Sequence, residues 1–329
     1  MTAARPRAKA RAGDAAAAVR ARRPARRLLE LRPRPPFRLD LTVWALRRRA
    51  QNQIDTWDGG CYRRALLLDD GPVEVAVRQP GRTSAPRLDV TVSGARPSAA
   101  NDALVGAALA RLLGLDIDLS GFYARAERDG ALRELVDRYR GVKPPRFPTL
   151  FECLLNAVAC QQLSIAAGLT LLNRLAVAAA PAAGNLHAFP APTDLLRLPP
   201  ARLRALGFSE RKAETIRELA AGTAAGQLEL ALLEPLDDAT VIATLTQRRG
   251  LGRWSADYVL LRGLGRLHVF PHSDVGALNG LRRFLAAAGR SDDPQDALAR
   301  FAPDAGLVYF HLLLRGLEQQ GLVDGPSPS

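Results

Sequence analysis

The sequence predicts a mostly α-helical protein in which a small α+β domain with an antiparallel sheet precedes a larger all-helical domain. Three observations support this prediction. Short runs with alternating apolar and polar residues lie between residues 61 and 94, where turn residues separate them. After about residue 117 the apolar residues recur with helical spacing. A glycine-rich turn near residue 250 then separates two helical segments.

The first segment, residues 1–36, carries most of the positive charge. It holds eleven Lys and Arg against Asp14 and Glu30, which is +9 of the formal net charge of +13. Almost no large apolar residue occurs before Leu28, so the segment cannot bury enough surface to fold alone. We predict a disordered basic tail that strengthens non-specific binding to DNA. A dispensable extension and an organellar transit peptide are the alternatives.

Residues 37–116 are expected to form the small α+β domain. The run FRLDLTVWALRRRA begins with alternation and becomes helical near Trp44, and a turn follows at 57–60. The runs YRRALLLDD, PVEVAVRQP and RLDVTVSG predict antiparallel strands, which the helix near Trp44 and a second helix at about 101–114 would cover. This segment has no catalytic signature, so we expect a structural or docking role.

Residues 117–325 are expected to form the helical domain. The apolar stretch at 150–179 is interrupted by polar residues, so it predicts two buried helices with a break at 161–164 rather than a membrane span. The proline-rich segment 190–200 predicts a connector, and Ser209 is the expected N-cap of the next helix. His311 lies on the last amphipathic helix, where a hydrogen-bonded core residue is expected.

The most informative stretch is residues 245–274, LTQRRGLGRWSADYVLLRGLGRLHVFPHSD. A helix runs into Gly250-Leu251-Gly252, and a second helix begins at about Trp254. The two glycines end the first helix and let another backbone approach closely. The unpaired N–H groups at the start of the second helix suit a phosphate. The alternative is an ordinary solvated turn between two helices.

The complete array of helix, Gly-Leu-Gly, helix, apolar run, proline and Asp274 resembles the helix-hairpin-helix DNA glycosylases. Within that superfamily, RWSADYVLLRG followed by VFPHSD is similar to the DNA-3-methyladenine glycosylase II (AlkA-type) branch. The resemblance covers roughly residues 37–320 and places the helix-hairpin-helix at about 239–263. It implies excision of alkylated purines, 3-methyladenine in particular, from duplex DNA in base excision repair.

The resemblance also implies roles for individual residues. Asp274 is the expected catalytic residue, although aspartate at a helix start is also a favoured N-cap. Trp254 and Tyr258 lie four residues apart on one helical face and could form an aromatic wall for a flipped base, with core packing as the alternative. Gln162 matches the position that fills the gap left by the extracted base, where a well-known relative has an apolar wedge. The remaining expected DNA contacts are Arg249, Gly250, Gly252, Arg253 and Ser255.

Base removal passes through a cationic sugar, which a carboxylate stabilises. Relatives that also cut the strand have a lysine nucleophile where this chain has Trp254, so we expect a monofunctional glycosylase without lyase activity. An alkylated purine is a cation that an aromatic wall attracts. Two alternatives stay open: a glycosylase of the same fold that prefers another base such as hypoxanthine or uracil, and a non-catalytic module that binds damaged DNA.

The sequence predicts no metal site and no other cofactor. Cys61, Cys153 and Cys160 form no CxxC pair, and the four clustered cysteines of an iron–sulfur cluster are missing. Hairpins of this type often hold a monovalent cation through backbone carbonyls, here around residues 248–251. The expected partners are double-stranded DNA and downstream enzymes that process the abasic site, with no membrane. We expect a monomer in the cytoplasm, associated with the nucleoid.

Overall fold

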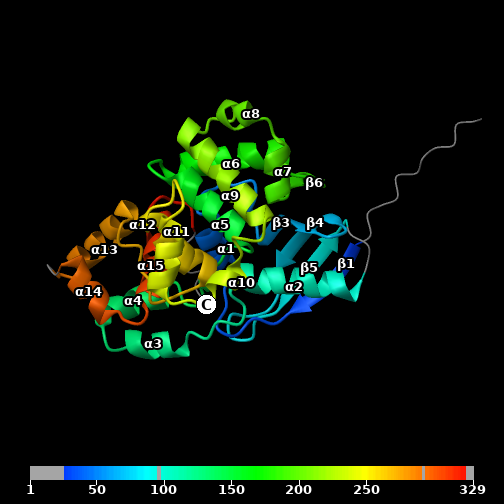
Figure 1. Cartoon of the computed structure of the whole chain (residues 1–329). Coiled ribbons are helices and arrows are strands. Elements are labelled where there is room, and N and C mark those ends of the chain that lie inside the picture. Colours follow the sequence, from blue (N-terminus) through cyan, green and yellow to red (C-terminus); the bar gives the residue numbers. More distant parts are fainter. Residues whose placement is uncertain (1–25, 95–97, 291–292, 324–329) are drawn as a thin grey trace, which may run out of the picture.

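The computed structural model describes residues 26–94, 98–290 and 293–323. It is mostly helical with a five-stranded antiparallel sheet at its N-terminal end, which confirms the predicted fold class (Figure 1). No helix in these ranges is long and apolar enough to cross a membrane.

The sheet has the strand order β1-β5-β4-β3-β2, and all neighbouring strands are antiparallel. Alternate residues are buried, as Val73, Val75 and Val77 show on one strand. They pack against two helices, α1 (Leu39–Arg47) and α2 (Ala99–Leu113). The strands are β1 (Arg26–Leu31), β2 (Thr56–Asp58), β3 (Cys61–Leu68), β4 (Gly71–Arg78) and β5 (Leu88–Ser93).

The predicted boundary of the basic tail was wrong. Residues 26–31 form β1 and pair with β5, so the small domain begins at least eleven residues before residue 37. Residues of β1 alternate between exposed and partly buried positions, as a strand requires, but the sequence RRLLEL does not show this alternation, because Arg27 lies on the covered face and Leu28 on the exposed one. The guanidinium group of Arg27 donates hydrogen bonds to the carbonyl of Ser98. Residues 1–25 of the predicted tail lie outside the described residues.

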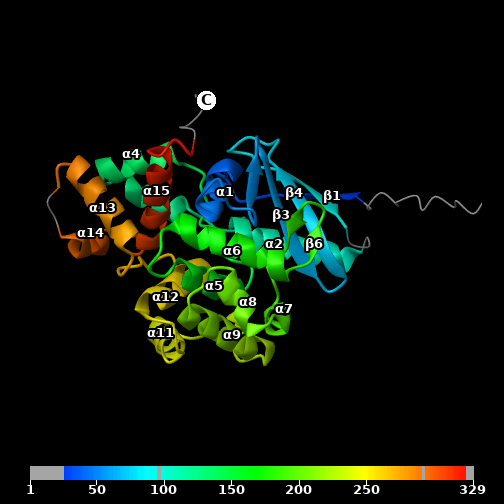
Figure 2. The same cartoon turned by 90° about the horizontal axis from the view of Figure 1, so that it is seen from above.

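Helix α1 belongs to the packing of both domains. Leu39, Val43 and Leu46 face the core beneath the sheet. Leu41 and Ala45, on the opposite side of the helix, face a core formed with the last helices of the chain. In both views α1 lies between the sheet and the helical part (Figures 1 and 2). The C-terminal end of α1 is therefore directed toward the interior of the helical domain.

The helical domain contains two cores. One is formed mainly by α5 to α12, and the other by α1, α3, α4 and α13 to α15 (Figure 1). The helices of the domain are α3 (Ser120–Ala126), α4 (Gly130–Arg138), α5 (Leu150–Cys160), α6 (Ile165–Ala179), α7 (Pro192–Arg197), α8 (Pro200–Ala205), α9 (Glu210–Ala224), α10 (Leu230–Leu233), α11 (Asp238–Thr246), α12 (Arg253–Tyr258), the π-helical segment η1 (Val259–Leu264), α13 (Val275–Ala287), α14 (Pro294–Arg300) and α15 (Ala305–Glu318). A two-stranded ribbon, β6 (Ala182–Ala183) and β7 (Leu186–His187), follows α6.

Several local predictions can be compared with this structure. The break at 161–164 between two buried helices is confirmed, and Ser209 caps α9 as expected. The connector at 190–200 was wrong, because α7 begins at Pro192, where proline is favoured in the first helical turn. His311 is fully buried and its Nδ1 lies 2.8 Å from the carbonyl of Leu307, which confirms a core role.

Candidate nucleic-acid and base-binding site

Two helices and a short turn build the glycine hairpin, which we define as residues 247–252. Asp237 caps α11 through the amide of Thr240, and α11 ends at Thr246. Gly250 has φ = +82°, a conformation that favours glycine. Gly252 is the N-cap of α12 and supplies no capping side chain. The first amides of α12 are therefore left for an external acceptor such as a phosphate.

The two hairpin glycines have different surroundings. A Cβ on Gly250 would lie 2.7 Å from Cγ2 of Thr215 and closer still to its Oγ1. Thr215 is buried, and its hydroxyl donates to the carbonyl of Arg211, so it has little freedom to move. A Cβ on Gly252 would meet nothing within 4 Å, and its backbone is extended. Gly250 is thus required by the fold, whereas Gly252 leaves open space at the surface of the hairpin.

This contrast predicts opposite effects for two matched substitutions. Gly250→Ala should lower the free energy of unfolding by about 2 kcal/mol, because left-handed strain and overpacking each cost on the order of 1 kcal/mol. Gly252→Ala should leave unfolding unchanged and weaken binding to duplex DNA roughly tenfold, since a methyl group would keep a phosphate away from the amides. Denaturant unfolding and fluorescence-anisotropy titration with duplex DNA measure the two quantities.

Gly130→Ala provides the control for this pair. Gly130 also has open space around its Cβ position, but it begins α4, away from the hairpin. Its replacement should change neither stability nor DNA affinity by more than a small amount. If Gly252→Ala bound DNA as tightly as Gly130→Ala does, the hairpin would not be the phosphate-binding element.

Gln161 connects the α5–α6 junction to the hairpin. Its Nε2 donates to the carbonyl of Gly250 at 2.9 Å and to the hydroxyl of Ser255 at 2.8 Å. Ser255 is buried, so its side chain faces the protein, and a contact with DNA would have to come from its backbone amide. Lys212 reaches the same place and caps the end of α5 through the carbonyls of Ala159 and Gln161. These contacts hold the two expected DNA-facing elements at a fixed separation.

Gln162 lies at the exposed tip of this junction. It is one of two non-glycine residues with positive φ (+55°) within the described ranges, and its side chain is exposed. The next residue, Leu163, is 46% exposed although it is a large apolar residue. Gln162 is thus an exposed residue directly after Gln161, which contacts the hairpin. Its role as the gap-filling residue stays a prediction.

Two of the expected DNA-binding arginines already have acidic partners. Arg249 lies 3.0 Å from Glu214, and Arg253 donates through Nε to Asp257 at 2.8 Å. Both guanidinium groups are mostly exposed. The Arg249–Glu214 pair is exposed on both sides, so water screens it and its energy is low, whereas the carboxylate of Asp257 is only 2% exposed. Arg249 can therefore exchange its carboxylate for a phosphate at small cost, whereas moving Arg253 away would leave the buried carboxylate of Asp257 without its partner.

Asp274 stands at the start of α13 and has two roles in the structure. Its Oδ1 accepts from the amide of Ala277 at 2.9 Å, so it is an N-cap. Its Oδ2 accepts from Nε1 of Trp254 at 3.3 Å, which brings the carboxylate onto the edge of the indole ring. Asp274 is half-buried, whereas the next residue, Val275, is 70% exposed. The carboxylate therefore lies at the boundary between the protein interior and solvent.

The structure brings Trp254 and Tyr258 together but turns their rings toward each other. The ring centroids lie 5.3 Å apart at an interplanar angle of 28°. Tyr258 is only 4% exposed, whereas Trp254 is half-buried. Burial raises the pKa of Tyr258, so its hydroxyl stays protonated at neutral pH. In this arrangement Trp254 is the exposed part of the aromatic wall, and Tyr258 supports it from behind.

Three residues near this site were missed by the sequence analysis. Arg48 donates to the hydroxyl of Tyr258 at 3.1 Å, from the end of α1. Arg262 is fully buried among aromatic rings, with its guanidinium carbon 5.9 Å from the Tyr258 centroid. Tyr309 is close enough to Asp274 for that carboxylate to add to the effect of burial, which raises the pKa of the Tyr309 phenol. Only Arg262 had a signal in the sequence, as a lone charge in the apolar run YVLLRGLG.

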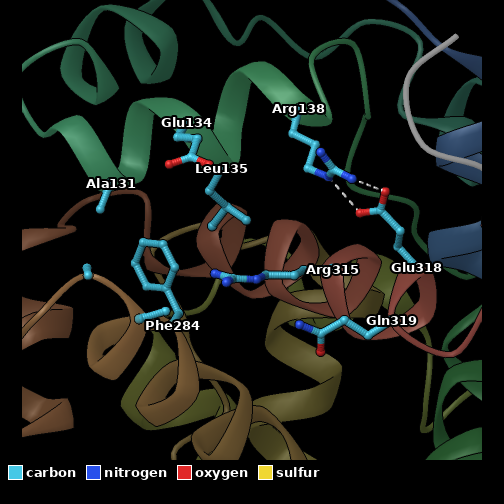
Figure 3. A pocket seen from close by; sticks show the side chains of 10 residues that line it. Ala131, Glu134, Leu135, Arg138, Phe284, Arg315, Glu318 and Gln319 are labelled. Atoms are coloured by element: carbon cyan, nitrogen blue, oxygen red, sulfur yellow. Dashed lines mark hydrogen bonds and ion pairs between the residues drawn. The ribbon is translucent and has the colours of Figure 1, made fainter.

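A separate hollow lies between α4, α13 and α15 (Figure 3). Arg138 and Glu318 form an ion pair on its wall, with Nε of Arg138 2.7 Å from a carboxylate oxygen. Arg315 lies over the ring of Phe284 at 5.8 Å from the centroid. None of the predicted site residues lines this hollow, so it is not the site that the sequence indicates.

The hairpin carbonyls are partly used within the protein. Gly250 accepts from Gln161, and Arg248 accepts from the amide of Leu251. Among the described residues, no group of three or more His, Cys, Asp or Glu could hold a metal ion. The monovalent cation at the hairpin stays a prediction.

Family comparisons match both parts of the chain. Residues 155–302 match the HhH-GPD superfamily base excision DNA repair proteins, and residues 28–148 match the AlkA N-terminal domain. The first match includes the α5–α6 junction, the hairpin and Asp274. The second match begins within β1, in agreement with the corrected boundary of the small domain.

Individual relatives agree with these matches. The DNA-3-methyladenine glycosylase 1 of Schizosaccharomyces pombe is 32% identical over 168 residues, which are 51% of this chain and 70% of the relative. A solved 3-methyladenine DNA glycosylase from Archaeoglobus fulgidus has a TM-score of 0.72 at 25% identity and covers 87% of this chain and 97% of its own. A solved 3-methyladenine DNA glycosylase of S. pombe, in complex with abasic DNA, has a TM-score of 0.51 at 26% identity, with 59% of this chain and 95% of its own covered. Two relatives from Bacillus subtilis match over only 47% and 57% of their own length.

Proposed function

The chain belongs to the HhH-GPD superfamily of base excision DNA repair proteins and carries an AlkA N-terminal domain, and from this membership we propose that it is a monofunctional DNA glycosylase that excises alkylated purines. Its substrate class is 3-methyladenine and similar bases in duplex DNA. It acts as a monomer on nucleoid DNA in the cytoplasm, and other enzymes process the abasic site that it leaves.

One observation carries this proposal, namely the contact between Asp274 and Trp254. A carboxylate at the edge of a partly exposed indole ring offers two functions within one small site. The ring can stack with a flipped base, and the carboxylate can face the sugar to which that base is attached. The free amides at the start of α12 lie next to Trp254. A phosphate bound to them would place the damaged nucleotide close to the indole ring and to the carboxylate of Asp274.

The chemistry follows from these positions. Alkylation at N3 or N7 gives the purine a positive charge, which makes it a better leaving group and favours stacking on an electron-rich ring. As the glycosidic bond breaks, the positive charge moves to the sugar, where the carboxylate of Asp274 stabilises it and orients a water molecule on the free face. A neutral indole at position 254 cannot form a Schiff base, so the DNA strand is left intact.

A second candidate substrate class is neutral bases such as hypoxanthine. Two guanidinium groups, those of Arg48 and Arg262, lie against Tyr258 in the interior of the site. A positive charge in a poorly solvated region repels a cationic base and attracts the electron-rich edge of a neutral one. This arrangement favours a glycosylase of the same fold that prefers a neutral base.

The test is single-turnover release of free base from three kinds of duplex. The first carries a methylated purine (7-methylguanine or 3-methyladenine), the second carries hypoxanthine, and the third carries uracil. We expect release of the methylated purines, with the strand intact until alkali is added. Faster release of hypoxanthine would support the second candidate instead. Tight DNA binding with no release from any duplex would overturn both candidates and leave a DNA-binding module. Strand cleavage without alkali would contradict the monofunctional mechanism.

A further inference from the structure

The last residue of the α1 region has an unusual backbone. Arg48 is the C-cap of α1 with φ = +62°, which favours glycine or asparagine over a long side chain. It is also 3% exposed, so a positive charge is held in the interior. Both features cost free energy, and such costs are typical of positions with a functional reason.

The guanidinium group of Arg48 crosses from the small domain into the helical domain. One terminal nitrogen donates to the hydroxyl of Tyr258 at 3.1 Å, and the other donates to Oδ1 of Asn156 on α5 at 2.9 Å. Its Nε has no hydrogen-bond partner within the described residues. No carboxylate contacts the group in this part of the structure, so a role as one half of a buried ion pair does not explain it.

A continuous series of contacts leads from this group to the carboxylate. Arg48 holds the hydroxyl of Tyr258, the Tyr258 ring stacks on Trp254, and the indole Nε1 of Trp254 donates to Asp274. A ring stack by itself leaves Tyr258 free to slide or tilt. A charged hydrogen bond at the far end of Tyr258 fixes both its depth and its tilt, and Trp254 then has one position from which to reach Asp274.

We propose that Arg48 is a positioning residue of the base site, through which the N-terminal domain holds Tyr258, and thereby Trp254 and Asp274, in the arrangement that acts on the base. This inference rests on the proposed function. It gives the small domain an indirect part in the reaction, through the position of Tyr258, whereas the sequence indicates only a structural or docking role.

The main variant is Arg48→Asn. Asparagine tolerates a positive φ, so it keeps the backbone turn, but it is too short to reach Tyr258. We expect the single-turnover rate of base release to fall about 10- to 100-fold, as for loss of a charged hydrogen bond, while the dissociation constant for duplex DNA changes less than about threefold. Arg48→Lys, which retains a charged donor, should recover most of the rate.

Two further variants separate positioning from general stability. Arg47→Met removes the neighbouring guanidinium, which is also buried but donates to the carbonyls of Ala50 and Trp57 instead of Tyr258. Its rate, measured below its melting temperature, should match wild type. Tyr258→Phe removes the acceptor for Arg48, so adding Arg48→Asn to it should cost little more. That non-additivity is expected only if Arg48 acts through the Tyr258 hydroxyl.

A spectroscopic readout does not depend on activity. In protein labelled with 5-fluorotryptophan, the Trp254 resonance, assigned with Trp254→Phe, should shift in Arg48→Asn and stay in place in Arg47→Met. The proposal is overturned if that resonance does not move, if Arg48→Asn and Tyr258→Phe are additive, or if Arg47→Met slows base release equally. A wild-type protein with no base release from any duplex would refute the proposed function, whereas the resonance of Trp254 would still decide whether Arg48 positions the ring.

Discussion

Asp274→Asn is expected to slow single-turnover release of methylated purine by about 10²- to 10⁴-fold, the range typical of losing a general base or an electrostatic stabiliser. Asparagine is a good N-cap and keeps an oxygen for the amide of Ala277, so α13 should stay intact. What disappears is the negative charge that, in the proposed mechanism, stabilises the developing sugar cation. DNA affinity should therefore stay close to that of wild type.

The matched control for this prediction is Asp237→Asn. Asp237 is also an aspartate N-cap, and its Oδ1 accepts from the amide of Thr240 at 2.7 Å at the start of α11. It carries the same change of charge and the same capping role without contact to Trp254. The control should release base at the wild-type rate. If both variants were equally slow, Asp274 would be acting as a helix cap and not as a catalytic residue.

Arg64→Met is expected to lower the free energy of unfolding by about 3–5 kcal/mol, the cost of removing one partner from a buried ion pair. Arg64 on β3 lies 2.7 Å from Asp55 and 2.5 Å from Glu152 on α5, and all three side chains are at most 4% exposed. Tyr62 donates a further hydrogen bond to Asp55. Without the guanidinium, two carboxylates would share a poorly solvated space between the sheet and the helical domain.

Denaturant unfolding of Arg64→Met and two comparison variants tests this prediction. Arg63→Met removes the next arginine, whose ion pair with Glu74 is partly exposed, and should cost about 1 kcal/mol or less. Adding Glu152→Gln to Arg64→Met should restore part of the stability. Burial already raises the pKa of Glu152, which means that its negative charge is costly to bury, and that cost grows when the Arg64 guanidinium is removed. Equal losses for Arg63→Met and Arg64→Met would show that the buried cluster has no special contribution.

Much of the fold was readable from local patterns. Three of the five strands, the two helices covering the sheet, the break between α5 and α6, and the hairpin follow periodicity and glycine placement. The first strand was missed because RRLLEL lacks the alternation of polar and apolar residues that the other strands have. The second strand was missed because three residues are too few for a periodic signal. Two of its residues, Trp57 and Asp58, lie within the predicted turn at 57–60.

The candidate site was predictable only in part, for a similar reason. Asp274, Trp254 and the glycines stand within one continuous stretch, where spacing and motif are visible. Arg48, which is 210 residues from Tyr258, lies among three consecutive arginines that look like an ordinary charged helix end. Ser255 was expected to face DNA, yet its side chain is bonded to Gln161, which is 94 residues away.

The sequence by itself determined the order of the sheet and the helical part, the hairpin and the choice of Asp274 as the candidate carboxylate, because each depends on residues that are neighbours along the chain. The tertiary structure decided which charges are buried, that Trp254 and Tyr258 stack, and that Arg48 of the small domain contacts Tyr258. Those properties depend on contacts between distant segments. The fold decides which groups surround a side chain, and these groups determine its hydrogen bonds and its access to water. The spacing of residues along the sequence does not predict them.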